Sequence, residues 1–501
     1  MLESGPQAPR ATSEPLDPSI AQPLQELLRD LPTSEVRGDP ATSVADVAYD
    51  SRRVAADGLF FCVPGHTTDG HAFAADAVAA GAGVLVVERW LDLPATQVLV
   101  PSVREAMGPV SAAFFGHPAR SLMVAGVTGT NGKTTTTYLL ESIFEAAGYR
   151  AGLIGTTGIR IGGAPLPAEH TTPEAPDLHR LLARMRDDGV GAVAMEVSSH
   201  GLDQHRVGGV RYACAVFTNL SQDHLDYHGT LEDYFLAKAR LFTTEMAAAA
   251  AINRDSPEGR RLLGGPVPAV SYGLEPGADL RATEVEVTAA GIGFTVDDLR
   301  ITSRLRGAFN VENCLAAMAA ARALGLDTGA SVRGLAEMDG VPGRFEAVDA
   351  GQDFTVLVDY AHTPDGIINV LRSARPLTAG RLIVVFGCGG DRDRGKRPLM
   401  GEAATSLADL TIVTSDNPRS EDPGAIIADI EPGARDGGGA YEIEPDRRAA
   451  IAQALAQAGP GDVVVIAGKG HETGQQFADH TIPFDDREVA GDELARMGGD
   501  G

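Results

Sequence analysis

Short apolar runs alternate with helical patterns along most of this chain. One set comprises residues 122–125, 192–195, 214–217 and 249–252, and a second comprises residues 355–358, 382–386, 410–413 and 463–466. Runs of four or five apolar residues between helices are typical of parallel strands that are buried on both faces. The pattern therefore predicts two α/β regions with parallel sheets.

Two other stretches show different patterns. Near the N-terminus, Leu59–Val63 and Val84–Val87 predict strands, with a helix at Phe73–Ala80 between them. Between residues 280 and 305, polar and apolar residues alternate, as in Ala282–Val287. This alternation predicts an antiparallel hairpin region that closes the first α/β region.

A glycine loop, VTGTNGKTT at Val127–Thr135, joins the first predicted strand to a helical pattern at residues 138–144. The backbone N–H groups of such a loop converge on one point, and the positive end of the following helix adds to them. The loop predicts a polyphosphate site in which Lys133 reaches the terminal phosphates and Thr134 places its hydroxyl on a magnesium ion. Val127 departs from the common pattern GxxxxGK[ST], which has glycine at that position.

The length of the chain, 501 residues, suggests about three domains. His117-Pro118 and Val341–Arg344 are typical of linkers, so we expect domains at residues 1–118, 119–342 and 343–501, with disorder at residues 1 to about 20. The predicted fold class is α/β with three domains: an N-terminal domain, a central P-loop-type parallel-sheet ATPase domain and a C-terminal Rossmann-like α/β domain.

The net charge of −26 argues against a generic nucleic-acid or anionic-membrane surface, because both need a basic patch. The four cysteines are far apart and form no CxxC pair, which argues against a disulfide framework or a zinc site. No signal-peptide pattern and no apolar run of about 20 residues occurs. We expect a reduced, cytoplasmic protein that binds no nucleic acid, does not insert into membranes and acts as a monomer.

Polar clusters follow the predicted strands. Glu196–Arg206 follows the strand at 192–195, and Thr218–Gly229 follows the strand at 214–217. A parallel sheet would bring Glu196 and His224 close to the phosphate loop, where a hard oxygen donor suits magnesium. A single histidine at a strand end is more often structural, but two clusters on adjacent strands downstream of a phosphate loop favour a functional site.

The second α/β region has four such clusters. They are Asp359–Asp365, Gly387–Arg397, Asp416–Arg419 and Gly468–Glu472. One cluster could be a solvated loop, but four successive strand ends with glycine and charged residues indicate one shared pocket. Its mixed charge suits a zwitterion, since arginine binds a carboxylate and a carboxylate binds an ammonium.

Together these motifs closely resemble the Mur ligase family, the ATP-dependent amide-bond ligases that build the peptide of bacterial cell-wall precursors. The resemblance runs from Asp50-Ser51-Arg52 to Glu472 and is carried, in order, by TGTNGKTT, EVSSHGLDQHR, FTNLSQDHLDYHG, DYAHTPD, GCGGDRD, DNPR and GKGHE. It implies an ATP-dependent acid–amino-acid ligase of peptidoglycan synthesis, and so a part in cell shape and cell division.

The resemblance also implies a role for each matching residue. The residues implied for ATP are Gly129, Thr130, Asn131, Gly132, Lys133, Thr134, Thr135, Asn310, Asn313 and Asp359. Those implied for the UDP-linked substrate are Tyr49, Ser51, His66, Thr67, Thr68, His170, Thr171, Thr172, Ser198, Gln204 and Arg206. Those implied for the incoming amino acid are Arg392, Asp416, Asn417, Pro418, Arg419, Gly468 and Glu472. His170 stands where close relatives often have asparagine, which leaves its own contact open.

Magnesium is the implied metal, with Thr134, Glu196, His224 and Lys238 as its residues. Lys238 falls where the family carries a carbamylated lysine (N6-carboxylysine), whose anionic oxygens can bind a cation. From its sequence alone, Lys238 would be an exposed helix residue. The implied catalytic set is Lys133, Glu196, His224 and Lys238.

The expected reaction joins meso-2,6-diaminopimelate to UDP-N-acetylmuramoyl-L-alanyl-D-glutamate through an acyl phosphate, with ATP and Mg²⁺. Because the three expected sites lie on three domains, domain closure should precede chemistry. The fork of Arg419 suits the extra carboxylate of diaminopimelate, Pro418 would aim it, and Glu472 would receive the far ammonium.

Three alternatives stay open. An L-lysine-adding ligase of the same family would share every motif except the amino-acid loop. A folylpolyglutamate synthase would share the chemistry but would not need Asp50-Ser51-Arg52 or His66-Thr67-Thr68. A regulatory P-loop NTPase would give the Asp416–Arg419 loop no function.

Overall fold

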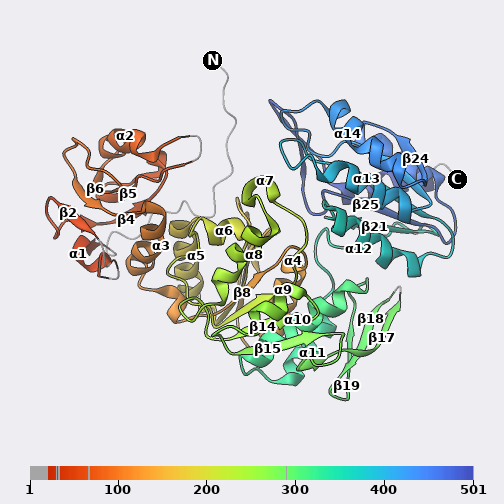
Figure 1. Cartoon of the computed structure of the whole chain (residues 1–501), viewed down its shortest axis with the longest axis horizontal. Helices are drawn as coiled ribbons and strands as arrows, with labels where there is room; N and C mark the ends of the chain where they lie inside the picture. The colour runs from red at the N-terminus through yellow and green to blue at the C-terminus, as the bar shows by residue number, and fades with distance from the viewer. Residues whose placement is uncertain (1–20, 30, 32–33, 66–67, 289, 500–501) are drawn as a thin grey trace.

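The structure is a computed structural model that describes residues 21–29, 31, 34–65, 68–288 and 290–499. Three α/β regions lie in a row along the long axis of the molecule, the first and last regions in sequence at its two ends (Figure 1). The expected disorder at residues 1 to about 20 lies outside the described residues. Within these residues, no helix is both long and apolar enough to span a bilayer.

The first region contains a five-stranded sheet in the order β2-β7-β6-β5-β4, parallel except for β2. The strand expected at Leu59–Val63 is β5, and the helix expected at Phe73–Ala80 is α2, which the 3₁₀ turn η3 precedes. Its elements are β1 (Gln22–Pro23), α1 (Leu24–Leu27), β2 (Glu35–Arg37), β3 (Ser43–Val44), β4 (Asp46–Ala48), η2 (Ser51–Arg53), β5 (Gly58–Phe61), η3 (Gly70–Phe73), α2 (Ala74–Ala79), β6 (Ala82–Val87), β7 (Thr96–Leu99), α3 (Val103–Phe114) and η4 (Pro118–Arg120).

The central region is built on a nine-stranded sheet in the order β11-β10-β9-β12-β8-β13-β14-β15-β16. It is parallel from β9 to β16, as the apolar runs predict, and β10 and β11 add an antiparallel edge. Its strands are β8 (Met123–Thr128), β9 (Ala151–Gly155), β10 (Gly158–Ile161), β11 (Ala164–Leu166), β12 (Ala192–Glu196), β13 (Cys214–Phe217), β14 (Ala250–Asn253), β15 (Ala269–Gly273) and β16 (Leu280–Arg281).

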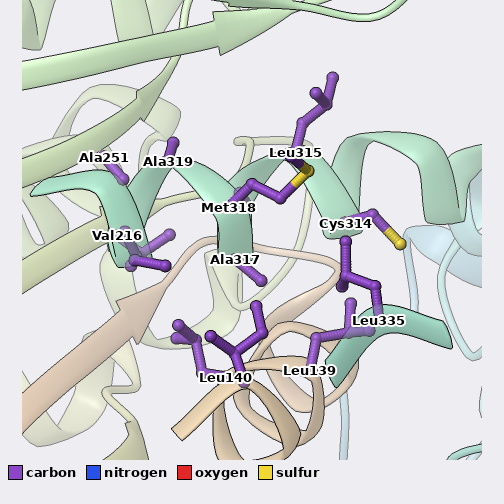
Figure 2. Close-up of a cluster of buried hydrophobic side chains, with 14 of the residues drawn as sticks. Leu139, Leu140, Val216, Ala251, Cys314, Leu315, Ala317, Met318, Ala319 and Leu335 are labelled. Atoms are coloured by element: carbon purple, nitrogen blue, oxygen red, sulfur yellow. The ribbon is translucent and has the colours of Figure 1, made fainter. Parts of the chain in front are cut away.

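Helices cover both faces of the central sheet. They are α4 (Lys133–Ala146), α5 (Ala175–Asp187), α6 (Ser199–Asp203), α7 (Leu225–His228), α8 (Leu231–Ala239), η5 (Arg240–Phe242), α9 (Pro257–Leu262), α10 (Phe309–Ala323) and α11 (Thr328–Glu337). On one face α4, α10 and α11 form a continuous core with the strands, in which Leu139, Cys314 and Leu335 meet (Figure 2). This core anchors α4, and with it the phosphate loop.

The hairpin region expected at 280–305 is a three-stranded antiparallel sheet of β17 (Thr283–Thr288), β18 (Gly291–Val296) and β19 (Leu299–Ser303). It packs beside α10 and α11 at the bottom of the view in Figure 1. Its start differs from the prediction, because residues 280 and 281 form β16 and extend the parallel sheet instead.

The last region is a six-stranded sheet in the order β20-β21-β25-β22-β23-β24, with helices on both faces and β20 antiparallel at one edge. Its elements are β20 (Glu346–Val348), β21 (Thr355–Asp359), α12 (Pro364–Ala374), η6 (Arg375–Leu377), β22 (Leu382–Phe386), α13 (Lys396–Leu407), β23 (Leu410–Val413), α14 (Pro423–Asp436), β24 (Ala440–Ile443), α15 (Arg447–Gln457), β25 (Val463–Ala467), β26 (Gly474–Gln476), β27 (Thr481–Pro483) and α16 (Asp486–Gly499). All four predicted strands of this region are present.

Candidate active site

The phosphate loop leaves β8 and enters α4 through two glycines. Gly132 caps α4 in a left-handed conformation (φ +84°). At Gly129 (φ +150°) a Cβ would lie 1.9 Å from the hydroxyl of Thr218, so the loop packs directly against the end of β13. The chain is still in β8 at Val127, which explains why this position does not need glycine.

Lys133 folds back over its own loop. Its Nζ donates to the carbonyl oxygens of Gly129 (3.0 Å) and Thr130 (2.8 Å). Burial lowers the pKa of Lys133, and the nearby Glu196 opposes that shift. An anionic phosphate at the loop would give this ammonium the counter-charge that two neutral carbonyls do not supply.

Glu196 is buried at the end of β12, and Thr156, which directly follows β9, holds its side chain. Its two carboxylate oxygens accept from the backbone N–H (2.9 Å) and the hydroxyl (3.1 Å) of Thr156. Gly155 makes room for this contact, since a Cβ there would lie 2.5 Å from Glu196 Oε1. The carboxylate is therefore fixed in direction beside the phosphate loop.

His224 caps α7 in a left-handed conformation and faces the same cavity. Burial holds the pKa of His224 far below its usual range, so its imidazole is neutral at physiological pH and can coordinate a cation. Among the described residues, no cluster of three or more His, Cys, Asp or Glu side chains suits a metal ion. Thr134, Glu196 and His224 fit a magnesium site only if a further oxygen donor joins them.

Lys238 is the largest departure from the sequence expectation. The side chain is buried, with 1% of its surface exposed, whereas an exposed helix residue was expected. Its Nζ donates to the carbonyl of Gly129 (2.9 Å) and lies 4.4 Å from the centre of the Tyr234 ring. Burial, and then the charge of Lys133, hold the pKa of Lys238 well below its ordinary value. This shift favours the neutral, nucleophilic form of the amine.

A cavity of about 300 Å³ lies over the phosphate loop. Of the expected ATP, substrate and metal residues, those that line it are Thr130, Asn131, Gly132, Lys133, Thr134, Thr135, Thr171, Glu196, Ser198, His224, Lys238, Asn313 and Asp359. Asn310 lies behind Asn313, whose amide donates to the Asn310 side-chain oxygen (2.7 Å). Asp359 accepts backbone hydrogen bonds from Phe345 and Ala361, both at 2.8 Å.

Arg344 reaches this cavity from the last region, although its sequence context indicated only a linker. Its guanidinium donates to Thr134 Oγ1 (3.0 Å) and lies 4.3 Å from the centre of the Tyr360 ring. The phosphate loop is tied to the same region by Asn131 Nδ2, which donates to Asp365 (3.0 Å). The last region therefore closes over the phosphate loop. The one sequence feature that could have drawn attention to Arg344 is its position immediately after Gly343.

A second cavity, of about 190 Å³, adjoins the first. Both are lined by Asp223, His224, Tyr360 and His362, so the two cavities meet at these side chains. Burial opposes charge on Asp223, but His362, His224 and Lys396 outweigh it and hold the pKa of its carboxyl below the usual range. Sequence reasoning gave Asp223 and His362 no role, because nothing local shows that they face both cavities.

Six of the seven expected amino-acid residues line the second cavity. They are Arg392, Asp416, Asn417, Arg419, Gly468 and Glu472. The seventh, Pro418, is buried behind it and leaves room only for a glycine at Gly390, where a Cβ would lie 1.9 Å from the Pro418 carbonyl oxygen.

Arg419 points into this cavity from a left-handed backbone (φ +52°). It donates to the carbonyl of Gly390 (2.7 Å), and burial together with the charge of Arg392 lowers the pKa of Arg419. A substrate carboxylate beside Arg419 would offset both its burial and its repulsion from Arg392. The expected ammonium acceptor, Glu472, already accepts from Asn417 (2.7 Å) and Lys469 (3.1 Å).

The expected UDP-substrate residues lie farther along the molecule. Thr171 faces the phosphate-loop cavity, Thr172 is buried and donates to the Glu196 carbonyl (3.0 Å), and Arg206 bonds to both Gln204 and the Thr172 carbonyl. His170 and Thr68 are exposed, and Ser51 opens η2. The Tyr49 hydroxyl donates to Asp177 on α5 (2.7 Å). His66 and Thr67 lie outside the described residues.

Family models match this chain in three consecutive parts. They describe a Mur ligase family catalytic domain at residues 43–115, a Mur ligase middle domain at residues 127–321 and a Mur ligase glutamate ligase domain at residues 343–470. The chain belongs to the Mur ligase family. This Mur ligase is similar to the UDP-N-acetylmuramoyl-L-alanyl-D-glutamate–2,6-diaminopimelate ligase of Geobacillus thermodenitrificans, with 48% identity over 93% of this chain and 98% of the relative.

Other relatives agree with this assignment. The ligase of the same name from Geobacter metallireducens is 47% identical over 93% of this chain and 97% of its own. A solved structure of a ligase of that name matches this Mur ligase with a TM-score of 0.69 and 36% identity, over 95% of this chain and 99% of the other. The Mycobacterium tuberculosis folylpolyglutamate synthase has a TM-score of 0.60 and 22% identity over 72% of this chain and 91% of its own, which shows a shared fold alone.

Proposed function

We propose that this Mur ligase joins meso-2,6-diaminopimelate to UDP-N-acetylmuramoyl-L-alanyl-D-glutamate, with conversion of ATP to ADP and phosphate. The relatives named for this reaction support it. The observation that carries the proposal is that the phosphate-loop cavity and a cavity with two arginines meet at shared side chains.

The geometry suits carboxylate activation. The terminal carboxylate of the UDP-linked dipeptide attacks the γ-phosphorus of ATP, ADP leaves, and an acyl phosphate forms. The amine of the amino acid then attacks the acyl carbon, and phosphate leaves from the tetrahedral intermediate. Lys133 and Arg344 supply positive charge where the carboxylate and triphosphate repel each other. Closure of the last region brings amine and acyl phosphate together.

Magnesium, when bound, would neutralise part of the triphosphate charge. Thr134, Glu196 and His224 are the residues we propose to hold it, with Lys238 as the further oxygen donor. Neutral Lys238 can add to CO₂: the nitrogen lone pair forms the N–C bond, one proton is released, and an anionic carbamate results. The burial of Lys238 supports this step, because it favours the neutral amine and an ammonium has no lone pair to donate.

We propose the meso-diaminopimelate preference from the environment of Arg419. L-Lysine lacks the second carboxylate and would leave a desolvated guanidinium that already faces the charge of Arg392. Arg419 is half-buried and keeps its bond to Gly390, so the lost charged hydrogen bonds should cost about 1.5 kcal/mol, or roughly tenfold in kcat/KM.

Steady-state kinetics with meso-diaminopimelate and L-lysine test this preference. The wild type should prefer meso-diaminopimelate, and Arg419→Ala should lose most of that preference. The exposed Arg394, which pairs with Glu421 and does not line the cavity, provides the matched control Arg394→Ala, whose preference should not change. Equal efficiency with both amino acids in the wild type would overturn the assignment.

We propose that the protein acts as a monomer on the cytoplasmic metabolites ATP and a UDP-sugar. We propose domain limits at residues 118/119 and 342/343. Light scattering with size-exclusion chromatography should give the mass of a single chain, and a dimer mass would contradict the monomer.

A further inference from the structure

A buried ion pair lies directly behind the amino-acid loops. Arg447 opens α15, Asp486 opens α16, and both side chains are fully buried. The guanidinium binds the carboxylate through two bonds, Nε to Oδ1 (2.8 Å) and Nη2 to Oδ2 (2.6 Å). A cation at a helix N-terminus is electrostatically unfavourable, so Arg447 needs other interactions that offset this cost.

The remaining donors of Arg447 bind two backbone carbonyls. Nη1 donates to the Ser415 carbonyl (3.3 Å) and Nη2 to the Ala467 carbonyl (3.0 Å). These residues immediately precede Asp416 and Gly468, with which the two amino-acid loops begin. The loops follow β23 and β25, which are not neighbours in the sheet because β22 lies between them. One guanidinium therefore joins two strand ends that the sheet itself does not hydrogen-bond together.

The two loops are packed too closely to tolerate much movement. At Gly468 (φ +119°) a Cβ would lie 2.8 Å from Asp416 Oδ2 and 3.8 Å from Arg447 Nη2. At Gly387, directly after β22, a Cβ would lie 2.4 Å from the Thr414 carbonyl oxygen. The two loops cross the end of β22 and are joined by side chains, since Asn417 Nδ2 donates to Glu472 (2.7 Å) and Lys469 Nζ donates to Asn417 (2.9 Å). Arg447 adds a link between the backbones from which the two loops start.

We propose that Arg447 is a positioning residue for the amino acid: with Asp486, it sets the distance between the Asp416–Arg419 and Gly468–Glu472 loops. The identity of that amino acid rests on the proposed function. A displacement of about 1 Å in groups that orient a substrate can cost as much as a hundredfold in rate. The planar guanidinium binds a carboxylate at two points and still reaches two carbonyls. The single ammonium of lysine cannot do this, so lysine does not replace arginine here.

The test compares the KM of each of the three substrates in Arg447→Lys and in the paired variant Arg447→Gln/Asp486→Asn, which leaves no unpaired buried charge. KM for meso-diaminopimelate should rise about tenfold to a hundredfold, with KM for ATP and for the UDP-linked dipeptide unchanged. Asp462→Asn is the matched control, because it breaks the ion pair with Arg381 at the opposite end of β25. A uniform rise in all three KM values, or the same change in the control, would overturn the proposal.

Hydrogen–deuterium exchange separates this inference from the proposed function. In Arg447→Lys, which keeps the buried charge and carries the test if the paired variant does not fold, the amides of residues 416–419 and 468–472 should exchange faster than in the wild type. The phosphate loop should not change. Unaltered exchange in both loops would overturn the positioning role. If the wild type does not use meso-diaminopimelate, the proposed function fails, and the KM comparison is made with the amino acid that it does use.

Discussion

Replacing Lys238 by methionine tests the ionisation of this buried lysine. In the folded protein the pKa of Lys238 is held well below its ordinary value, first by burial and then by Lys133. In the unfolded chain the amine stays protonated up to about pH 10.4. Between these two pKa values the unfolded state binds the extra proton, so the free energy of unfolding rises with pH by up to ~1.4 kcal/mol per pH unit. Methionine has a similar length and no proton, so this contribution disappears.

Calorimetry of the wild type and Lys238→Met in CO₂-free buffer, from about pH 7 to about pH 9.5, measures the difference. For a domain of 150–250 residues, 1 kcal/mol corresponds to roughly 2–4 °C in Tm, so the advantage of the methionine variant should shrink by roughly 3–6 °C per pH unit. Parallel Tm profiles for the two proteins would show that Lys238 is charged in the folded state, and would refute the argument.

Carbamylation makes a separate prediction for the same pair of proteins. Bicarbonate should raise the Tm of the wild type by mass action and leave Lys238→Met unchanged. The chain has four lysines, Lys133, Lys238, Lys396 and Lys469, so ¹³C-bicarbonate should give a carbamate resonance that is simple to assign. A third protein, Lys238→Ala, should lose about 10²–10³-fold in kcat and recover partly with formate or acetate, which can enter the space that alanine leaves. A kcat equal to that of the wild type in the unrescued variant would contradict the carbamate proposal.

The remaining predictions concern the phosphate loop and the Val341–Arg344 linker. Lys133→Ala should abolish turnover, because removal of a phosphate-facing cation forfeits several kcal/mol; a rate near that of the wild type would mean that ATP binds elsewhere. Arg344→Ala should raise KM for ATP by roughly tenfold or more, since a charged hydrogen bond contributes about 1.5–3 kcal/mol, and an unchanged KM would remove Arg344 from the site. Gly343→Ala should impair folding and activity, since its Cβ would lie 2.0 Å from the nitrogen of His471. Gly351→Ala, at a positive φ with open space around it, should show only the smaller backbone strain in thermal unfolding, and equal losses would refute the role of the clash.

Much of the architecture follows from local patterns in the sequence. Apolar runs of four or five residues predict the parallel strands β8, β12, β13, β21 and β25, because a strand buried on both faces needs no alternation. Each motif follows such a run directly. Since parallel strands carry their loops at one edge, the convergence of Glu196, His224 and the phosphate loop could be expected without a structure.

The burial of individual charged side chains could not be predicted in this way. In α8, Leu236 is 51% exposed while Lys238 is 1% exposed, the reverse of what their hydrophobicity suggests. A nine-residue helix shows too little periodicity to identify its inner face. Only the packing of α8 against the phosphate loop decides that Lys238 faces inward.

Contacts between distant segments also belong to the tertiary structure alone. Arg344 meets Thr134 across 210 residues, and Arg447 meets Asp486 across 39. The sequence by itself determined the order of strands and helices and the chemistry at each strand end, because these depend on neighbouring residues. The tertiary structure decided which charges are desolvated and which side chains join the two cavities, because desolvation depends on every segment that packs around a group.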